Sequence, residues 1–299
     1  MIFINYYDEI KNELVNNEIT KKVKDYSKNR SDLITYYNVG KLLSKAGKHY
    51  GEGIIKEYSD RLSSELNIKY SVRTLYKIIK YFNYMNKQKV PTVSAKLSWS
   101  HYDELLKLTD ENIINYYIKI SEEQNLSVRE LRKKIKSNEY ERLDEETKKK
   151  LKNKEELKVP DLVKNPIQIK NTSGNNEISE KVLQKLILED IPSFLKELGS
   201  GFSFIDNEYK IKIGDRYNYI DLLLFNYEFN CFVVVELKVS ELKKEHIGQI
   251  EFYMNYIDKN LKNINQNKTI GIIICKKENR YVIEYCSDDR ILAREYELI

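Results

Sequence analysis

The sequence predicts a two-domain protein, in which an all-α N-terminal domain precedes an α/β C-terminal domain. Three observations lead to this fold class. The chain has 299 residues, 41% of them hydrophobic, which is enough to build two cores. Apolar residues recur at helical spacings through the first half of the chain. Apolar runs rich in β-branched residues, separated by helical segments, follow in the C-terminal third.

The N-terminal domain is predicted to begin with helices over residues 8–30, 31–45, 54–66 and 71–85. A cluster of three glycines after residue 45 is expected to interrupt them, and Ser71 is a candidate N-cap. A helix, a short connector and a basic helix are typical of helix-turn-helix and winged-helix domains. Arg73, Lys77 and Lys80 are therefore candidate nucleic-acid-binding residues, although a solvated helix face explains the same cations.

The remainder of this domain is predicted to be helical as well. A polar loop containing Pro91 leads to a helix near Trp99, and the capping box Ser127-Val128-Arg129-Glu130 begins another helix. Charged and then polar residues with two prolines follow, a composition that favours an interdomain linker. The predicted organisation is a helical domain over 1–145, a linker over 146–174 and an α/β domain over 175–299.

Two predicted strands each carry a carboxylate. Asp221 is the only charge in the apolar run 217–225, where an unpaired charge costs several kcal/mol. The apolar run 231–235 ends in Glu236-Leu237-Lys238. Because side chains alternate along a strand, Glu236 and Lys238 should share a face while Leu237 points into the core. A hairpin between the two runs would place Asp221 beside Glu236.

This arrangement predicts a divalent cation site. Two neighbouring carboxylates repel unless a cation lies between them, and oxygen donors suit Mg²⁺ or Mn²⁺. Such an ion polarises a phosphoryl oxygen and acidifies bound water, while a lysine can orient that water and stabilise the developing charge. The chemistry indicated is phosphodiester hydrolysis. An ordinary ion pair at a strand end is the alternative for Glu236 and Lys238.

Helices are predicted on both sides of these strands. The segment 177–198 is expected to be helical with a kink at Pro192, and 243–258 to be a helix with a buried apolar stripe. Gln249 and Tyr253 are four residues apart and so share a face, where they could hold a phosphate or the lysine. A polar helix face with a half-buried tyrosine is the alternative. Strands are predicted over 269–275 and 281–285.

The order of these elements resembles the PD-(D/E)XK nuclease superfamily, and the motifs resemble its YhcG-type family across roughly residues 15–298. The segments that carry this resemblance are Tyr219-Ile220-Asp221-Leu222-Leu223, Val235-Glu236-Leu237-Lys238, Gly248-Gln249-Ile250-Glu251-Phe252-Tyr253 and Leu126-Ser127-Val128-Arg129-Glu130-Leu131. The resemblance implies a restriction-endonuclease-like domain with a mixed central sheet, and a metal-dependent endonuclease.

The resemblance also implies roles for individual residues. Asp221, Glu236 and the Leu237 carbonyl match metal ligands, Lys238 matches the catalytic lysine, and Gln249 and Tyr253 match an accessory pair. Family members often add a glutamate from the preceding helix, for which the candidates are Glu180 and, as alternatives, Glu177 and Glu189. Where the family commonly has Gln-Tyr-Arg, this chain has Glu208-Tyr209-Lys210, so the role of Glu208 is open.

Composition narrows the setting and the partners. The sequence contains no apolar run of membrane-spanning length, and its start lacks the charged region of a signal peptide. Three cysteines without ligand spacing are expected to be reduced thiols, which favours a cytoplasmic protein. Residues 1–100 hold 18 Lys and Arg against 10 Asp and Glu. This basic excess fits nucleic-acid binding, and also fits a solvated basic surface.

The function expected is a Mg²⁺- or Mn²⁺-dependent nuclease, with DNA the favoured substrate through the family resemblance. Defence against foreign DNA is slightly favoured over other DNA processing. Two alternatives differ in kind: a catalytically silent module that binds nucleic acid or a protein, and a nuclease acting on RNA. A homodimer is also conceivable, because cutting a duplex requires two strand breaks.

Overall fold

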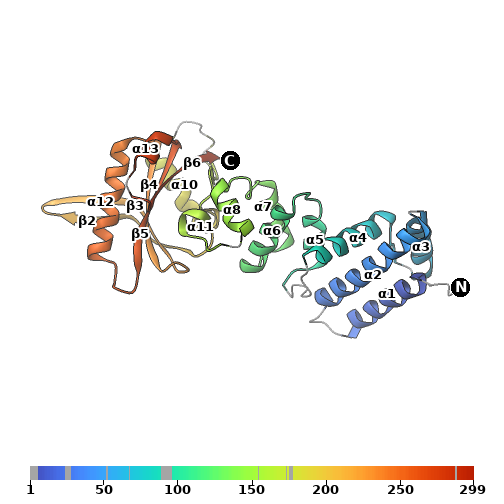
Figure 1. The fold of residues 1–299 in the computed structure, drawn as a ribbon. Helices are drawn as coiled ribbons and strands as arrows, with labels where there is room; N and C mark the ends of the chain where they lie inside the picture. Colours follow the sequence, from blue (N-terminus) through green and yellow to red (C-terminus); the bar gives the residue numbers. More distant parts are fainter. Residues whose placement is uncertain are drawn as a thin grey trace. The chain divides into compact units, whose positions relative to one another are not determined.

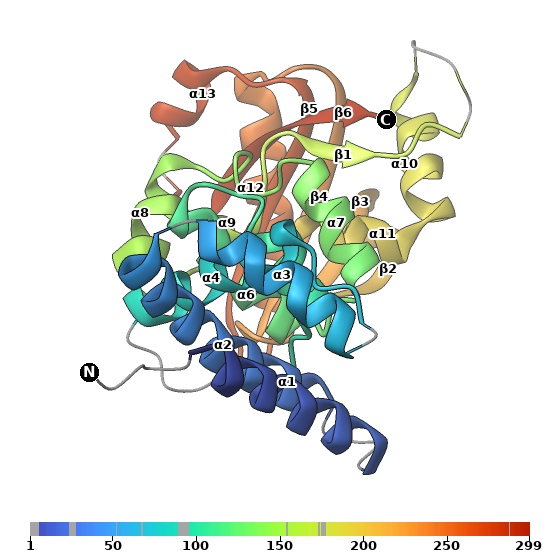
Figure 2. The same cartoon turned by 90° about the vertical axis from the view of Figure 1, so that its right-hand side faces the viewer.

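The chain is described from a computed structural model that places residues 6–23, 28–51, 53–66, 68–88, 96–153, 155–172, 174, 178–286 and 288–299. Pro91 and Glu177 lie outside these residues. The chain divides into two compact units, residues 1–137 and 138–299, which can be followed by colour in Figures 1 and 2. Each unit has a hydrophobic core of its own.

The first unit is helical, as the sequence predicts. Its helices are α1 (Tyr6–Val23), α2 (Lys28–Tyr50), α3 (Gly53–Leu66), α4 (Val72–Lys87), α5 (Trp99–Leu105), α6 (Glu111–Glu123) and α7 (Val128–Lys136). Both predicted caps form, since Ser71 Oγ accepts from the backbone N–H of Thr74 at 3.2 Å and Glu130 closes the box with Ser127. The described residues of this unit contain no strand. The structure therefore supports a helical domain, and the described residues of this unit do not include the β-hairpin that a winged-helix domain would have.

Helix α2 runs further than its glycines predict. It passes through Gly47 and ends at Tyr50, after which Gly51 adopts a φ of +82°. One glycine inside a helix costs only about 1 kcal/mol, and burial of Leu43 and Ala46 on the preceding turn outweighs that cost. The positive φ of Gly51 is the usual helix-ending conformation, so it is this glycine that stops the helix.

The second unit is built on a mixed six-stranded sheet of order β1-β6-β5-β4-β3-β2. Strands β2, β3 and β4 are antiparallel neighbours, whereas β4, β5, β6 and β1 are parallel. This confirms the predicted mixed sheet. The strands are β1 (Ile167–Ile169), β2 (Phe202–Ile213), β3 (Arg216–Asn226), β4 (Cys231–Glu241), β5 (Asn267–Lys277) and β6 (Ile291–Leu298).

Helices cover both faces of this sheet (Figures 1 and 2). Helices α10 (Glu180–Glu189) and α11 (Ile191–Leu198) pack on the face that carries Leu222, Val233 and Val235. Helix α12 (Lys244–Asn260) packs on the opposite face, against Leu223 and Val234. The predicted kink at Pro192 is a break between two helices, because Asp190 ends α10 and its side chain caps α11.

The segment expected to be a linker belongs to the second unit. It contributes α8 (Glu145–Asn153), α9 (Val159–Leu162) and strand β1, which pairs with β6. Polar contacts hold it in place: the Arg294 guanidinium donates to Val163 O at 2.9 Å and to the Asp144 carboxylate at 2.8 Å. The buried Lys164 ammonium lies 3.7 Å from Glu139 and 4.0 Å from Glu197. The polar composition of this segment suggested a solvated linker. In the structure its polar groups pair inside the fold instead of facing solvent.

The prediction of a strand over 281–285 is wrong. Those residues form the short helix α13 (Arg280–Glu284), and the sixth strand is β6. Tyr281 and Tyr285, at the two ends of the predicted strand, are both exposed. Aromatic residues stabilise a strand by packing on a half-buried surface, whereas in this segment Val282 and Ile283, and not the two tyrosines, pack against the core.

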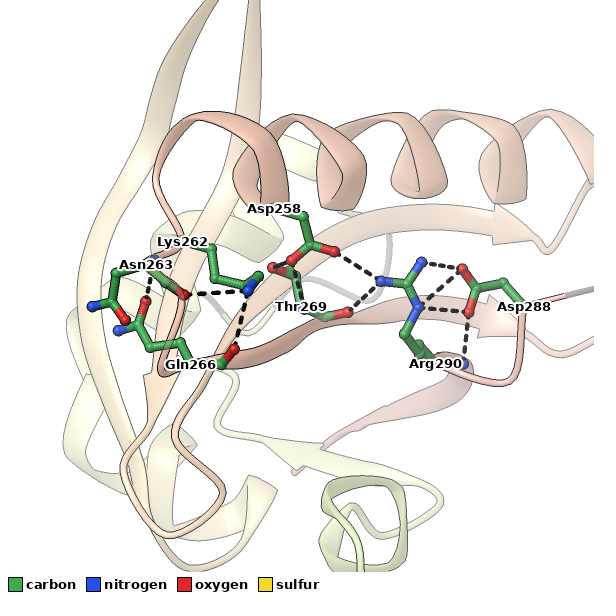
Figure 3. Close-up of polar contacts among 7 residues, drawn as sticks. All are labelled: Asp258, Lys262, Asn263, Gln266, Thr269, Asp288 and Arg290. Carbon is green, nitrogen blue, oxygen red and sulfur yellow. Dashed lines mark hydrogen bonds and ion pairs between the residues drawn. The ribbon is translucent and has the colours of Figure 1, made fainter.

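A polar network fixes α12 and the loop after it to the sheet (Figure 3). Asp258 Oδ1 accepts from the backbone N–H and the hydroxyl of Thr269 on β5, at 2.9 and 2.7 Å, and Oδ2 accepts from Arg290 Nη1 at 3.0 Å. Asp288 holds the same guanidinium through Nε. Gly271 allows close approach at the middle of the helix, since a Cβ there would lie 2.5 Å from Met254 Sδ. The orientation of α12 is thus set at two points.

Two glycines of α2 give a test of packing in the first unit. A Cβ on Gly40 would lie 2.6 Å from Ile78 O on α4, whereas a Cβ on Gly47 would meet nothing within 4 Å. Gly40→Ala should therefore destabilise the unit by about 1–3 kcal/mol through overpacking, and Gly47→Ala should stabilise it by about 0.5–1 kcal/mol through helix propensity. Urea unfolding followed by fluorescence of Trp99, the chain's one tryptophan, measures both. Equal effects of the two substitutions would contradict this packing.

Candidate active site

Asp221 lies where two antiparallel strands part. The ladder between β3 and β4 ends at the pair Leu222↔Val235. Beyond it, Asp221 Oδ2 accepts a hydrogen bond from the backbone N–H of Leu237 at 2.7 Å, and the Asp221 carbonyl accepts one from Gln184 Nε2 on α10 at 3.0 Å. The aspartate is therefore held in the gap between the strands by two fixed contacts.

Glu236 and Lys238 follow on β4 and are both buried. The Lys238 ammonium donates to Glu236 Oε1 at 2.8 Å. Glu236 is only 2% exposed, and its second oxygen, Oε2, is buried with no hydrogen-bond partner among the described residues. Leu237 points to the opposite face and packs in the core under α10 and α11, as strand alternation predicts. One carboxylate oxygen of Glu236 thus lacks a partner.

Helix α10 brings one of the three candidate glutamates to this place. Glu180 is the first residue of α10, and its Oε2 lies 3.7 Å from the Lys238 ammonium. Glu189 lies at the other end of the helix, where it accepts a hydrogen bond from the Thr172 hydroxyl at 2.6 Å. Of the two candidates among the described residues, the structure therefore favours Glu180.

Burial and crowding of charge perturb these groups. Burial, reinforced by the charge of Asp221, raises the pKa of Glu236 to about 7. Burial raises the pKa of Asp221 also; the Leu237 amide opposes this, and the charges of Glu180 and Glu208 add to it. Burial alone would lower the pKa of Lys238, but the hydrogen bond and charge of Glu236 outweigh it, so the pKa lies above its usual value. The site holds more negative charge than its one lysine neutralises.

Helix α12 presents Gln249 and Tyr253 to the same region. Gln249 Nε2 donates to the Tyr253 hydroxyl at 3.2 Å, and the Tyr253 side chain is buried. Burial is the main cause of the raised pKa of this phenol, and the charges of Glu236 and Asp221 raise it further. The pair predicted from four-residue spacing therefore forms, and it lies within electrostatic range of both carboxylates.

His246 is a neighbour of the site that the sequence reasoning missed. It is buried on α12, three residues before Gln249 and seven before Tyr253, and so lies on the same helical stripe. Its Nδ1 accepts the backbone N–H of Lys243 at 3.2 Å. Burial lowers its pKa, and the Lys238 charge lowers it further. Its spacing from the Gln-x-x-x-Tyr pair was the signal that could have identified it.

Glu208 occupies an unusual backbone position on β2. Its φ is +49°, a left-handed conformation that non-glycine residues rarely adopt and that costs about 1–3 kcal/mol. It lies next to the pair Asn207↔Leu222, which places it opposite Asp221 in the register. Its side chain is exposed, and its charge contributes to the raised pKa of Asp221. Glu208 therefore adds negative charge beside the aspartate.

The candidate nucleic-acid-binding residues of the first unit have structural partners. Lys77 forms an ion pair with Asp103 on α5, and the Lys80 ammonium donates to the carbonyl of Leu106 just after that helix. Arg73 is exposed. Two of the three cations thus connect α4 to α5. Neither interpretation of the sequence, a solvated helix face or a nucleic-acid-binding surface, included these contacts. A nucleic-acid role for Arg73, Lys77 and Lys80 stays a prediction.

Among solved structures, a repair endonuclease from Pyrococcus abyssi is 19% identical to this chain with a TM-score of 0.29, over 42% of this chain and 49% of that one. The EndoMS–dsDNA2 complex is 18% identical with a TM-score of 0.32, over 43% and 49% of the two chains. Both likenesses cover less than half of either chain.

Sequence relatives are more informative. The YhcG protein of Escherichia coli (strain K12) is 26% identical over 219 residues, which cover 69% of this chain and 58% of the relative, so the match spans less than two thirds of that protein. Residues 160–299 match the family described as the YhcG PDDEXK nuclease domain, and residues 9–142 match the DUF1016 N-terminal domain. With its helical and its mixed-sheet region both matched, the chain belongs to the YhcG-type PD-(D/E)XK nuclease family.

Proposed function

We propose that the second unit hydrolyses phosphodiester bonds of DNA with the help of a divalent cation. The observation that supports this most directly is the buried Glu236 Oε2, which has no hydrogen-bond partner among the described residues and lies on a carboxylate whose pKa is raised by burial and further by the Asp221 charge. Burying a carboxylate oxygen without a hydrogen-bond partner is costly, and a bound cation offsets that cost. DNA as the substrate rests on the resemblance to the nuclease family.

The residues present fit such an ion. The proposed set consists of two side chains and one backbone carbonyl, since among the residues that the structure places no three His, Cys, Asp or Glu side chains are grouped so that they could hold a metal. Asp221 and Glu236 supply two carboxylates, and the Leu237 carbonyl would supply a third oxygen. Three oxygen donors suit Mg²⁺ or Mn²⁺, ions that keep several water ligands. Bound there, the ion would polarise a phosphoryl oxygen and acidify a water molecule.

The chain's own residues would do the remaining work. Lys238 is held protonated by its carboxylate neighbours, so its ammonium can donate to a phosphate oxygen as negative charge develops on the phosphate. Asp221 is kept in place by the Leu237 amide and therefore need not reorganise during the reaction. Gln249 and Tyr253, bonded to each other on a fixed helix, can orient the lysine or the phosphate. Defence against foreign DNA remains a proposal at family level.

The cation requirement gives a pH dependence that can be measured without any activity. The pKa of Glu236 is raised in the folded state from 4.5 to about 7. Protonated Glu236 therefore adds stability that is complete below the unfolded pKa and is lost as the pH rises through about 7. This contribution to the free energy of unfolding is up to about 3 kcal/mol, and Glu236→Gln should remove it.

Urea unfolding of the metal-free protein between pH 5 and 8, followed by circular dichroism, measures this loss. Glu241→Gln, at the exposed end of the same strand, is the control that should retain the pH dependence. Adding Mg²⁺ or Mn²⁺ at pH 8 should restore stability to the wild type and not to Glu236→Gln. If Glu236→Gln and Glu241→Gln show the same pH profile and the same response to the cation, Glu236 does not hold it.

Catalysis is tested by cleavage of plasmid and linear DNA with Mg²⁺. Asp221→Asn and Lys238→Met should each lower the rate by about 100-fold or more, because each removes electrostatic stabilisation inside a buried site. Asp206→Asn on β2 and Lys243→Met before α12 make the same changes of charge at exposed positions and should leave the rate within about twofold.

Other outcomes of this assay separate the alternatives. Nucleic-acid binding by a wild type that cuts neither DNA nor RNA would indicate a catalytically silent binding module. Cleavage of an RNA panel, with DNA left intact and the same dependence on Asp221 and Lys238, would assign the activity to RNA. If Asp221→Asn and Lys238→Met both cleave at the wild-type rate, these residues do not form the active site.

A further inference from the structure

The β2–β3 hairpin extends beyond the rest of the sheet. Pairing of β3 with β4 ends at Leu222↔Val235, whereas β2 and β3 stay paired as far as Ile213↔Arg216, next to the turn at Gly214. This outer part of the hairpin is therefore a two-stranded ribbon, and it projects at the left of Figure 1. It begins at Asp221, so it is continuous with the candidate active site.

The two faces of this ribbon differ. One face carries Ile211 and Ile220, which are fully buried in the core under α12, with Tyr209 and Ile213 packed against that core. The other face is formed by two cross-strand pairs, each a lysine opposite a tyrosine. These four residues, here called the Lys–Tyr face, are Lys210, Tyr219, Lys212 and Tyr217.

The Lys–Tyr face is exposed and positively charged. Tyr217 and Tyr219 are each 51% exposed, and both lysines are exposed. The ammonium of Lys210 lies 3.9 Å from the centroid of the Tyr217 ring, and that of Lys212 lies 5.9 Å from it. Among the described residues, neither lysine forms an ion pair with a carboxylate. Both positive charges therefore remain available to an anionic partner.

Phosphate is the anion that this face suits best. Lysines bind phosphates as point charges, and exposed aromatic rings add apolar contact with sugars or bases. A strand rises about 3.3 Å per residue, so Tyr219 and Tyr217 lie about 7 and 13 Å along β3 from Asp221. Base pairs of DNA are spaced about 3.4 Å along the helix axis, so these distances correspond to roughly two and four base pairs.

We infer that the Lys–Tyr face binds the backbone of duplex DNA about two to four base pairs from the phosphodiester that is cleaved at the site of Asp221 and Glu236. The inference rests on the proposed function for the identity of the substrate. It goes further by assigning a substrate-binding surface to the outer part of the hairpin, beyond Asp221, which carries no catalytic group. The lysines supply binding and position, while the chemistry stays with β3 and β4.

The test compares two double variants of the full chain. Lys210→Ala/Lys212→Ala removes two charges from the Lys–Tyr face. Lys259→Ala/Lys268→Ala removes two exposed charges from the opposite end of the same unit. Binding of a fluorescent duplex is measured by anisotropy in EDTA, so that no cleavage occurs, over roughly 50 to 200 mM salt. Thermal melting checks that both variants remain folded.

Each phosphate contact contributes about 0.9 to the slope of log affinity against log salt concentration. The Lys210→Ala/Lys212→Ala variant should therefore bind more weakly, with a slope smaller by about 2, and the control should match the wild type. Tyr217→Ala/Tyr219→Ala should weaken binding with little change of slope, because it removes no charge. An unchanged slope for the lysine variant, or absence of duplex binding by the wild type, would overturn the inference.

These outcomes are independent of the cleavage assay. If the wild type cuts DNA but the lysine variant has an unchanged salt slope, the nuclease function is supported and the hairpin does not bind the DNA backbone. A changed slope in a protein that cuts no nucleic acid would support the DNA contact while removing the nuclease function.

Discussion

The arrangement of the second unit depends on the point where β3 and β4 part. A ladder of hydrogen bonds that continued past Leu222↔Val235 would occupy the Leu237 amide, and Asp221 would have no reason to turn toward β4. Because the ladder stops, the aspartate takes that amide as its own partner and lies beside Glu236. Two carboxylates are thereby brought together inside the fold. Because they repel each other, the site requires positive charge beside them.

Two helices place further groups around this pair of carboxylates from opposite faces of the sheet. On one side, α10 holds the Asp221 carbonyl through Gln184 and places Glu180 near the Lys238 ammonium. On the other, α12 presents Tyr253, whose hydroxyl lies in the field of both carboxylates. The position of α12 does not depend on the site itself, because the network at Asp258 and the close packing at Gly271 fix it. Tyr253 is thus held near the carboxylates by a helix whose position is set by contacts away from them.

Much of this could be predicted from the sequence, and what could not has a common cause. A lone charge in an apolar strand and a Glu-x-Lys at a strand end identified Asp221, Glu236 and Lys238, because burial of charge leaves a local pattern. Strand β1 gave no such pattern, since Arg294 and Lys164 hold its neighbourhood through contacts distant in sequence. The pairing of Lys77 with Asp103 and the left-handed backbone of Glu208 likewise depend on which segments meet in space.

The charge balance of the site explains why a positive surface should lie beside it. Glu180, Asp221 and Glu236 surround a single ammonium, and Glu208 adds a fourth carboxylate to the field at Asp221. One divalent cation would leave this cluster close to neutral, so the site by itself attracts a polyanion weakly. Affinity for a phosphate backbone must then come from cations outside the cluster. The hairpin that carries Asp221 supplies them on the same strands, a few residues from the carboxylate, where they add attraction without disturbing the buried ion pair.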